Sequence, residues 1–278
     1  MSFKFLYSTR NISTLFIVFF FQFLSVSAQS QNNCVVPYNP TPASTWGMVQ
    51  KFQSNTVIWN GGTPTAADLN GDGLVDVFIG GANEKGGAIY IQNATGGFVK
   101  KTQPAFAPFN EMEDVAAVFY DADKDGDMDL LIGAGGNHKL KSSGLLNHRL
   151  FLNDGKANFT YQQNAFPEFG FNTGVMVPMD FDGDGDADLI SIALFPDVAA
   201  RPGEGAMYFE NKKGTFVPMT LPIQHLGRWS VMDIADVDGD GDLDVALGSH
   251  AVAKFPEGGF DPQWKQAKGL LILRNKTK

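Results

Sequence analysis

Four acidic stretches recur along the chain at a nearly constant interval. Each is nine residues long, with Asp at its first, fifth and ninth positions: DLNGDGLVD at 68–76, DADKDGDMD at 121–129, DFDGDGDAD at 180–188 and DVDGDGDLD at 236–244. Their starts lie 53, 59 and 56 residues apart. Self-similarity at such a period indicates a repeat architecture, in which each unit buries its apolar face against the next one.

Short apolar runs surround each acidic stretch in the same order. One run precedes it, as VAAVFY does at 115–120, one follows it, as LLIGAGG does at 130–136, and a third comes later, as RLFLND does at 149–154. In the first three units a polar turn and a Phe-containing run complete the unit, as in GKANFTY at 155–161. Runs of this length, separated by Gly and Asn turns, predict β-hairpins. We therefore expect each unit to form four antiparallel strands.

Units of four antiparallel strands with just over 50 residues each are typical of the blades of a β-propeller. The sequence therefore predicts an all-β fold with four visible repeats. The last unit ends at RNKTK (274–278), where its fourth strand should begin, whereas residues 46–59, WGMVQKFQSNTVIW, belong to no unit. We expect residues 46–59 to supply the missing strand and to close the ring. An open arc of four units is the alternative.

Residues 1–28 are predicted to be a secretory signal. Lys4 and Arg10 precede a largely apolar stretch at 11–24, and VSA at 26–28 offers the small residues of a cleavage site. Cleavage there would leave a linker at 29–45 and a propeller domain at 46–278, working in an extracellular, periplasmic or cell-surface location. An uncleaved anchor is the alternative, although the apolar stretch is short for a membrane span. No later segment is long and apolar enough to be transmembrane.

The acidic stretches have the composition of calcium loops. Oxygen ligands at positions 1, 3 and 5, a Gly at position 6 and a backbone carbonyl at position 7 form the first half of an EF-hand loop. Carboxylates without sulfur or imidazole favour Ca²⁺ over zinc or copper, and Mg²⁺ demands stricter octahedral geometry. The expected ligands, with position 7 contributing its carbonyl, are Asp68, Asn70, Asp72, Leu74, Asp76, Asp121, Asp123, Asp125, Asp127, Asp129, Asp180, Asp182, Asp184, Asp186, Asp188, Asp236, Asp238, Asp240, Asp242 and Asp244.

These loops are not EF-hands, because position 12 is Ile79, Ile132, Ser191 or Leu247 and never the required Glu. The ninth-position Asp must close the loop instead. Polar turns without metal are the alternative reading, but the crowded carboxylates would then repel one another. Eighteen of the 30 acidic residues lie in the four loops, and about four Ca²⁺ would bring the net charge of −9 close to zero. The first loop, with Asn70 and Leu74, should bind most weakly.

The DxDxDGxxD loops and the GGF- and GTF-type turns resemble the FG-GAP/VCBS repeats of integrin α-subunit propellers and of many bacterial exported proteins. Within that group, GGNHKLKSSGLLNHRLFLNDGKANFT at 135–160 is similar to the ASPIC/UnbV, cartilage acidic protein-like branch. The resemblance covers roughly residues 60–278 and implies a propeller with calcium in the blade loops. It also implies work outside the cell or in the cell envelope. Propellers of this group usually have seven or eight blades, whereas four repeats are visible here.

The leading functional hypothesis is a non-enzymatic binding, adhesion or scaffold module that contacts a protein or glycan. Long insertions at 139–147, 196–205 and 251–266 fall at the same place in three units, and extended loops on one face commonly bind ligands. Aromatic and basic contact candidates are Phe255, Phe260, Trp264, Trp229 and Arg201.

The alternative is a carbohydrate-active enzyme, a polysaccharide lyase or glycoside hydrolase on a calcium-stabilised propeller. Glu111, Glu113 and Asp114 could house its acid and base, although a solvated loop explains them more simply. The four histidines show no HExxH spacing, and no GxSxG occurs. No clustered basic stripe suggests a nucleic-acid partner.

Overall fold

The strands form four antiparallel sheets of four strands each, as the repeat pattern predicts. The computed structural model describes residues 6–7, 63–82, 85–136, 143–168, 170–193, 205–221, 223, 226–227, 229–249 and 268–276. The strands of the first sheet are β2 (Pro64–Ala67), β3 (Asp76–Ile79), β4 (Ala88–Gln92) and β5 (Phe98–Lys101). Those of the second sheet are β6 (Glu113–Tyr120), β7 (Asp129–Gly135), β8 (Arg149–Asn153) and β9 (Phe159–Tyr161).

The third and fourth sheets repeat this arrangement. The third consists of β10 (Thr173–Met179), β11 (Asp188–Ala193), β12 (Ala206–Asn211) and β13 (Phe216–Thr220). The fourth consists of β14 (Trp229–Ala235), β15 (Asp244–Ser249), β16 (Leu270–Arg274) and β1 (Leu6–Tyr7). Short 3₁₀ helices, η2 (Pro104–Phe109) and η3 (Ser143–Leu146), lie between strands of this series. The four predicted hairpin units are therefore confirmed.

The outermost place in the fourth sheet is taken by β1, whose Leu6 and Tyr7 pair with Arg274 and Leu273 of β16. We expected residues 46–59 to fill this place, but that segment lies outside the described residues. Because β1 falls within the predicted signal, cleavage after Ala28 would remove it. Strand β16 would then form an edge of the sheet.

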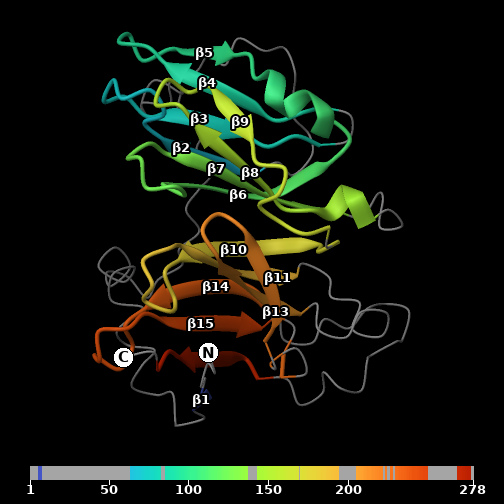
Figure 1. Ribbon diagram of the computed structural model, residues 1–278, viewed down its shortest axis with the longest axis vertical. Coiled ribbons are helices and arrows are strands. Elements are labelled where there is room, and N and C mark those ends of the chain that lie inside the picture. The colour runs from blue at the N-terminus through green and yellow to red at the C-terminus, as the bar shows by residue number, and fades with distance from the viewer. Residues whose placement is uncertain are drawn as a thin grey trace, which may run out of the picture.

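The four sheets stack one after another, with the first sheet at one end and the fourth at the other (Figure 1). Each apolar core lies between two consecutive sheets. Phe78, Ile89, Leu130 and Phe151 join the first sheet to the second. Leu131, Leu150, Leu189 and Phe209 join the second to the third, and Ile190, Tyr208, Val245 and Leu247 join the third to the fourth. Among the described residues, no apolar core joins the fourth sheet to the first, so a closed ring is not seen.

This stacking explains which strands are buried throughout. Strand β7 is buried at all seven residues, because Leu130 and Ile132 face the first sheet while Leu131 faces the third. Strand β14 alternates instead: Met232 and Ile234 pack against the third sheet, whereas Val231, on the opposite face, is 61% exposed. A strand covered on both faces reads as a continuous apolar run, and a strand covered on one face alternates.

Each acidic loop joins the first strand of its sheet to the second, and its ninth residue begins that second strand. Asp76, Asp129, Asp188 and Asp244 are thus the first residues of β3, β7, β11 and β15. All four loops consequently leave their sheets at the same strand end and lie along one edge of the stack.

Candidate metal centres

The ninth-position aspartates are buried acceptors that tie the loop to the third strand of the sheet. In the second sheet, Asp129 Oδ2 accepts the backbone N–H of Ala122 at 2.8 Å, and Oδ1 accepts that of Asn153 at 2.8 Å. The four ninth-position aspartates, Asp76, Asp129, Asp188 and Asp244, are each at most 1% exposed. The corresponding donors are Leu69 and Gln92 to Asp76, Phe181 and Asn211 to Asp188, and Val237 and Asn275 to Asp244.

Burial of three of these carboxylates, Asp76, Asp129 and Asp188, disfavours their charged form. Burial raises the pKa of Asp129 to about 6, although the two N–H donors act in the opposite direction. Burial likewise raises the pKa of Asp188 to about 6 and raises that of Asp76. The nearby charges of Asp123 and Asp125 add to the shift at Asp129. A bound cation would reverse this balance, because opposite charge favours the ionised carboxylate.

The first residue of each loop is held at the centre of the turn. Asp68 accepts the backbone N–H groups of Asn70, Gly71 and Asp72 at Oδ1 and that of Gly73 at Oδ2. In every loop the position-6 Gly donates to the position-1 carboxylate, and its φ lies between 82° and 95°. This left-handed conformation favours Gly, which explains why position 6 is Gly in all four loops.

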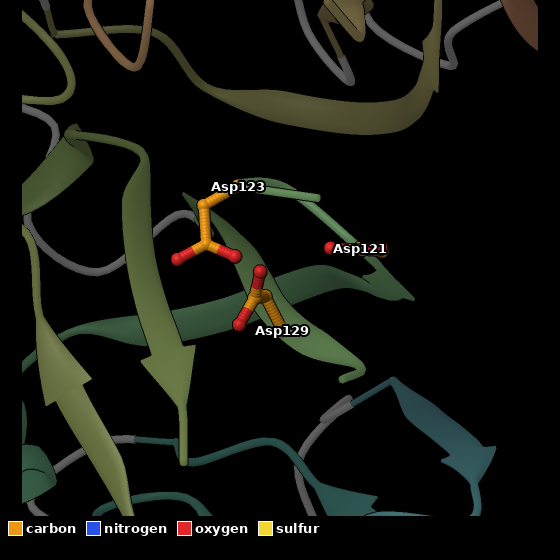
Figure 2. A group of neighbouring side chains, drawn as sticks. All are labelled: Asp121, Asp123 and Asp129. Carbon is orange, nitrogen blue, oxygen red and sulfur yellow. The ribbon is translucent and has the colours of Figure 1, made fainter. Parts of the chain in front are cut away.

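Three loops bring carboxylates from positions 1, 3 and 9 together. Within each group, one oxygen per residue lies within 4.8 Å of the others. Figure 2 shows one group, in which the side chains of Asp123 and Asp129 point toward each other beside Asp121. The groups are Asp121, Asp123 and Asp129; Asp180, Asp182 and Asp188; and Asp236, Asp238 and Asp244.

The remaining predicted ligands are arranged differently. The position-5 carboxylates, Asp72, Asp125, Asp184 and Asp240, each accept the backbone N–H of position 7 and lie outside the three groups. In the first loop, Asn70 Nδ2 donates to Asp72 Oδ2 at 3.0 Å, so an amide takes the place of a third carboxylate. Carbonyl ligation by Leu74, Asp127, Asp186 and Asp242 remains a prediction.

The residues present fit an oxygen-preferring metal ion. The three groups contain only carboxylates, the ligands that Ca²⁺ and Mg²⁺ prefer. In the fourth sheet, Asp238 Oδ1 is buried and has no hydrogen-bond partner among the described residues. An unpaired buried anionic oxygen is costly unless a cation meets it.

The chain also brings basic side chains to two of the loops, which the sequence reasoning missed. Lys124 Nζ lies 2.5 Å from Asp186 Oδ1 of the next loop. Arg274 Nη1 and Lys276 Nζ lie 3.1 and 3.2 Å from Asp238 Oδ2, and Lys276 Nζ lies 3.3 Å from Asp240 Oδ2. The Lys at 124 was visible as a departure, because the other three loops have Gly at position 4.

The acid and base candidates do not form an exposed carboxylate cluster. Asp114 is 4% exposed, and its Oδ1 pairs with Arg149 Nη2 at 2.5 Å. Its Oδ2 accepts the backbone N–H of Gly81 at 2.5 Å, and Gly81 follows β3 in the first sheet. The Arg149 guanidinium also lies over the ring of Phe109, 5.4 Å from its centroid. Asp114 therefore joins the first two sheets and is not placed for proton transfer to a substrate.

Of the proposed contact residues, only Trp229 is described. It is 1% exposed, and its Nε1 donates to the carbonyl of Ile223 at 3.1 Å, so it belongs to the core. Arg201, Phe255, Phe260 and Trp264 lie outside the described residues. In the described part of the chain, no helix has the length and apolar character to cross a membrane.

Comparison with known proteins supports the repeat assignment. Residues 68–132 match the family model of the FG-GAP-like repeat. No curated protein matches the chain. Among 42 matching chains of solved structures is the Vibrio cholerae biofilm matrix protein Bap1, with 15% sequence identity and a TM-score of 0.36. The match covers 64% of this chain and 23% of Bap1, and it is too remote to carry an argument.

The family match spans the first acidic loop, the whole second loop and part of β7. The narrower resemblance to the ASPIC/UnbV branch stays a prediction. Strand order and loop position recur in all four sheets. This chain is thus an all-β protein that carries an FG-GAP-like repeat at residues 68–132.

Proposed function

We propose that this protein is an exported, calcium-binding β-propeller-type module that binds a protein or glycan outside the cell. One observation carries the proposal: three sheets place the same trio of aspartates, from positions 1, 3 and 9, within reach of a single ion. A carboxylate group recurring at one repeat position, with a buried member each time, is difficult to explain as a solvated turn. Export rests on the predicted signal at residues 1–28.

Calcium is the ion that suits these loops best. Each trio supplies three carboxylate oxygens, and position 5 and the carbonyl of position 7 would raise the number to five. The second oxygen of a carboxylate, or water, would complete the shell of six or more oxygens that Ca²⁺ takes. We propose about four sites, of which the first is the weakest because Asn70 replaces a carboxylate and already bonds to Asp72.

The ion would act by locking strands of the same sheet together. The ninth-position carboxylate already holds the third strand through one oxygen and the loop through the other, as Asp129 does with Asn153 and Ala122. An ion shared by positions 1, 3 and 9 would neutralise their repulsion and fix the loop on this frame. A metal-filled sheet would therefore be stiffer and more stable than a metal-free one.

Partner binding is proposed for the edge opposite the metal loops. The long connections β7–β8, β11–β12 and β15–β16 leave the far end of the second strands, whereas the acidic loops enter the near end. Calcium would thus set the shape of the stack, and the opposite edge would contact the partner. Extended loops on a rigid scaffold commonly carry binding function.

Native mass spectrometry of metal-stripped protein tests the metal part of the proposal. Titration with CaCl₂ should add up to about four calcium masses per chain, and MgCl₂ at the same concentration should add fewer. Protein with Asp121, Asp180 and Asp236 all changed to Asn should not bind the three calcium ions of the loops at 121–129, 180–188 and 236–244. Absence of any calcium adduct at millimolar CaCl₂ would contradict the proposal.

A further inference from the structure

We propose that basic residues of the chain grade the calcium affinity of the three carboxylate loops, from tightest at 121–129 to weakest at 236–244. Arg274 and Lys276 are assigned as the residues that weaken the last site, and Lys124 as the one that moderates the middle site. The inference rests on the proposed calcium binding and extends it, because it states how the sites differ and which residues set the difference.

The loop at 236–244 already has two chain cations on its ligands. Arg274 Nη1 and Lys276 Nζ both contact Asp238 Oδ2, at 3.1 and 3.2 Å, and Lys276 also contacts Asp240. Arg274 is the last residue of strand β16 and Lys276 follows two residues later, and Asn275 between them donates its backbone N–H to Asp244. The two cations are therefore held beside the loop by the same strand end that anchors its ninth residue.

The basic residues do not satisfy this loop completely. Both contact the same oxygen of Asp238, Oδ2, while Oδ1 is buried without a partner among the described residues. The loop thus keeps an unpaired anionic oxygen within the carboxylate group of Asp236, Asp238 and Asp244. We infer a site that still takes a divalent ion, but against opposing positive charge.

The loop at 121–129 has the opposite surroundings. In the described part of the chain, no Lys or Arg side chain forms an ion pair with its five aspartates. The residue after Asn153, which corresponds to Lys276 after Asn275, is Asp154. The same repeat position thus adds a negative charge in one sheet and a positive charge in another.

The loop at 180–188 lies between these extremes. Lys124 Nζ reaches Asp186 at 2.5 Å, and the charge of Lys213 also acts on Asp186. Asp186 lies outside the carboxylate group of its loop, whereas Asp238 belongs to the group of the last loop. Lys124 has a φ of 66° at position 4, where Gly71, Gly183 and Gly239 have φ of 73° to 76°. A left-handed conformation is unfavourable for a residue with a side chain. A strained Lys on the preceding loop therefore supplies one cation to this one.

Coulomb repulsion gives the expected size of the effect. A unit charge about 6 Å from a divalent ion, screened as in water, changes the binding constant by roughly tenfold. Two cations at the loop 236–244 would lower its affinity by up to about a hundredfold, less at high salt. This site would then fill and empty over a calcium range in which the loop 121–129 stays occupied.

Calorimetric calcium titration of the metal-stripped full chain tests this grading. We compare the wild-type protein with Arg274→Gln/Lys276→Gln and with the control Lys100→Gln/Lys101→Gln, which removes two positive charges from β5. The first variant should tighten one weak site about tenfold or more, and the control should not. Adding Asp236→Asn to the first variant should abolish the tightened site. Lys124→Gly should tighten a different site, which Asp180→Asn abolishes. Circular dichroism checks that each variant is folded.

Unchanged or weaker binding by Arg274→Gln/Lys276→Gln would overturn the inference while leaving calcium binding intact. Weaker binding would mean that the two residues hold Asp238 in place for the ion. A tightened site that survives Asp236→Asn would also overturn the assignment. No calcium bound by any of the proteins would overturn the proposed function, and the inference with it.

Discussion

At the scale of single residues, the aspartates of one loop have different duties. Asp129 is buried and accepts two backbone N–H groups, whereas the exposed Asp123 accepts the N–H of Asp125 at 3.3 Å. Position 9 therefore belongs to the fold as well as to the metal group. The side chain at position 3 contributes to stability mainly when an ion is bound.

Substitution of these two residues should separate the duties. In EGTA, Asp129→Ala should lower the free energy of unfolding by about 2 kcal/mol, because two N–H donors lose their acceptor, partly offset by removal of a buried charge. Asp123→Ala should change it by less than about 0.5 kcal/mol. In CaCl₂ both variants should lose stability. Urea unfolding in each buffer measures this, and equal effects of the two variants in EGTA would contradict the separation.

The ion pair between Asp114 and Arg149 should prove structural. Arg149→Met should lower the free energy of unfolding by about 3–5 kcal/mol, because Asp114 remains buried without its counter-charge. Arg149→Met/Asp114→Asn should recover part of that loss, since the neutral amide can still accept from Gly81. Urea unfolding of the three proteins provides the test. A loss of under 1 kcal/mol in Arg149→Met would mean that Asp114 is less buried than described.

His148 should make the protein sensitive to mild acid. Burial, with the nearby charge of Arg149, lowers its pKa to about 3, and the rings of Phe166, Phe171 and Phe209 surround it. Since the unfolded chain takes up a proton near pH 6.5, this stability is present above pH 6.5 and is lost toward pH 3.

The expected loss from His148 is about 1.4 kcal/mol between pH 7.5 and pH 5.5. The raised pKa values of Asp129 and Asp188 act in the opposite sense, since those residues bind protons more readily when folded. The comparison must therefore be with His148→Phe, in EGTA. That variant should lose about 1.4 kcal/mol less than the wild type over this interval. Parallel pH profiles for the two proteins would contradict a neutral, buried His148.

At the scale of elements, the sequence predicts the strands well and their contacts poorly. Strand order and the acidic loops follow from turn residues and apolar runs, which are local signals. The missed contacts join distant residues: Lys124 and Asp186 are 62 positions apart, and Asn153 and Leu69 are 84 apart. Such pairs meet only when sheets stack, and nothing in either segment alone indicates the partner. Strand β1 could not be predicted for the same reason.

The side chain of Asn153 should hold two sheets together. Its Nδ2 donates to the carbonyl of Leu69 at 2.9 Å, from the second sheet to the first, and Asn275 does the same from the fourth sheet to Phe181. Asn211 instead donates to Ala187, within the third sheet's own loop. Asn153 and Asn275 therefore act between sheets, and Asn211 acts within one.

Asn153→Ala should lower the free energy of unfolding by only about 1 kcal/mol, because the Leu69 carbonyl still accepts a hydrogen bond from the N–H of Ala157. Hydrogen exchange should become faster at amides of the first sheet as well as the second. In the matched control Asn211→Ala, faster exchange should stay within the third sheet. Faster exchange confined to the second sheet in Asn153→Ala would show that this contact does not couple the sheets.

At the scale of the whole molecule, stability depends on a stack of similar units with charged loops along one edge. In the described part of the chain, three apolar cores hold the sheets together, while 18 of the 30 acidic residues of the sequence lie in the loops. The apolar faces stay packed whether or not metal is bound. Loss of metal should therefore disturb the loops more than the packing of the sheets. Without counter-ions, however, repulsion along the loop edge opposes folding in every unit at once.

Thermal unfolding in millimolar CaCl₂ and in EGTA, with bound metal measured by mass spectrometry, tests the central claim most directly. Calcium a few hundredfold above its Kd should contribute about 3–4 kcal/mol per filled site. The midpoint should therefore fall by more than about 10 °C in EGTA. A fall of that size, with several calcium ions per chain, is the predicted result. An unchanged midpoint with no bound metal would contradict the account, because it would mean that the four aspartate loops do not bind stabilising calcium.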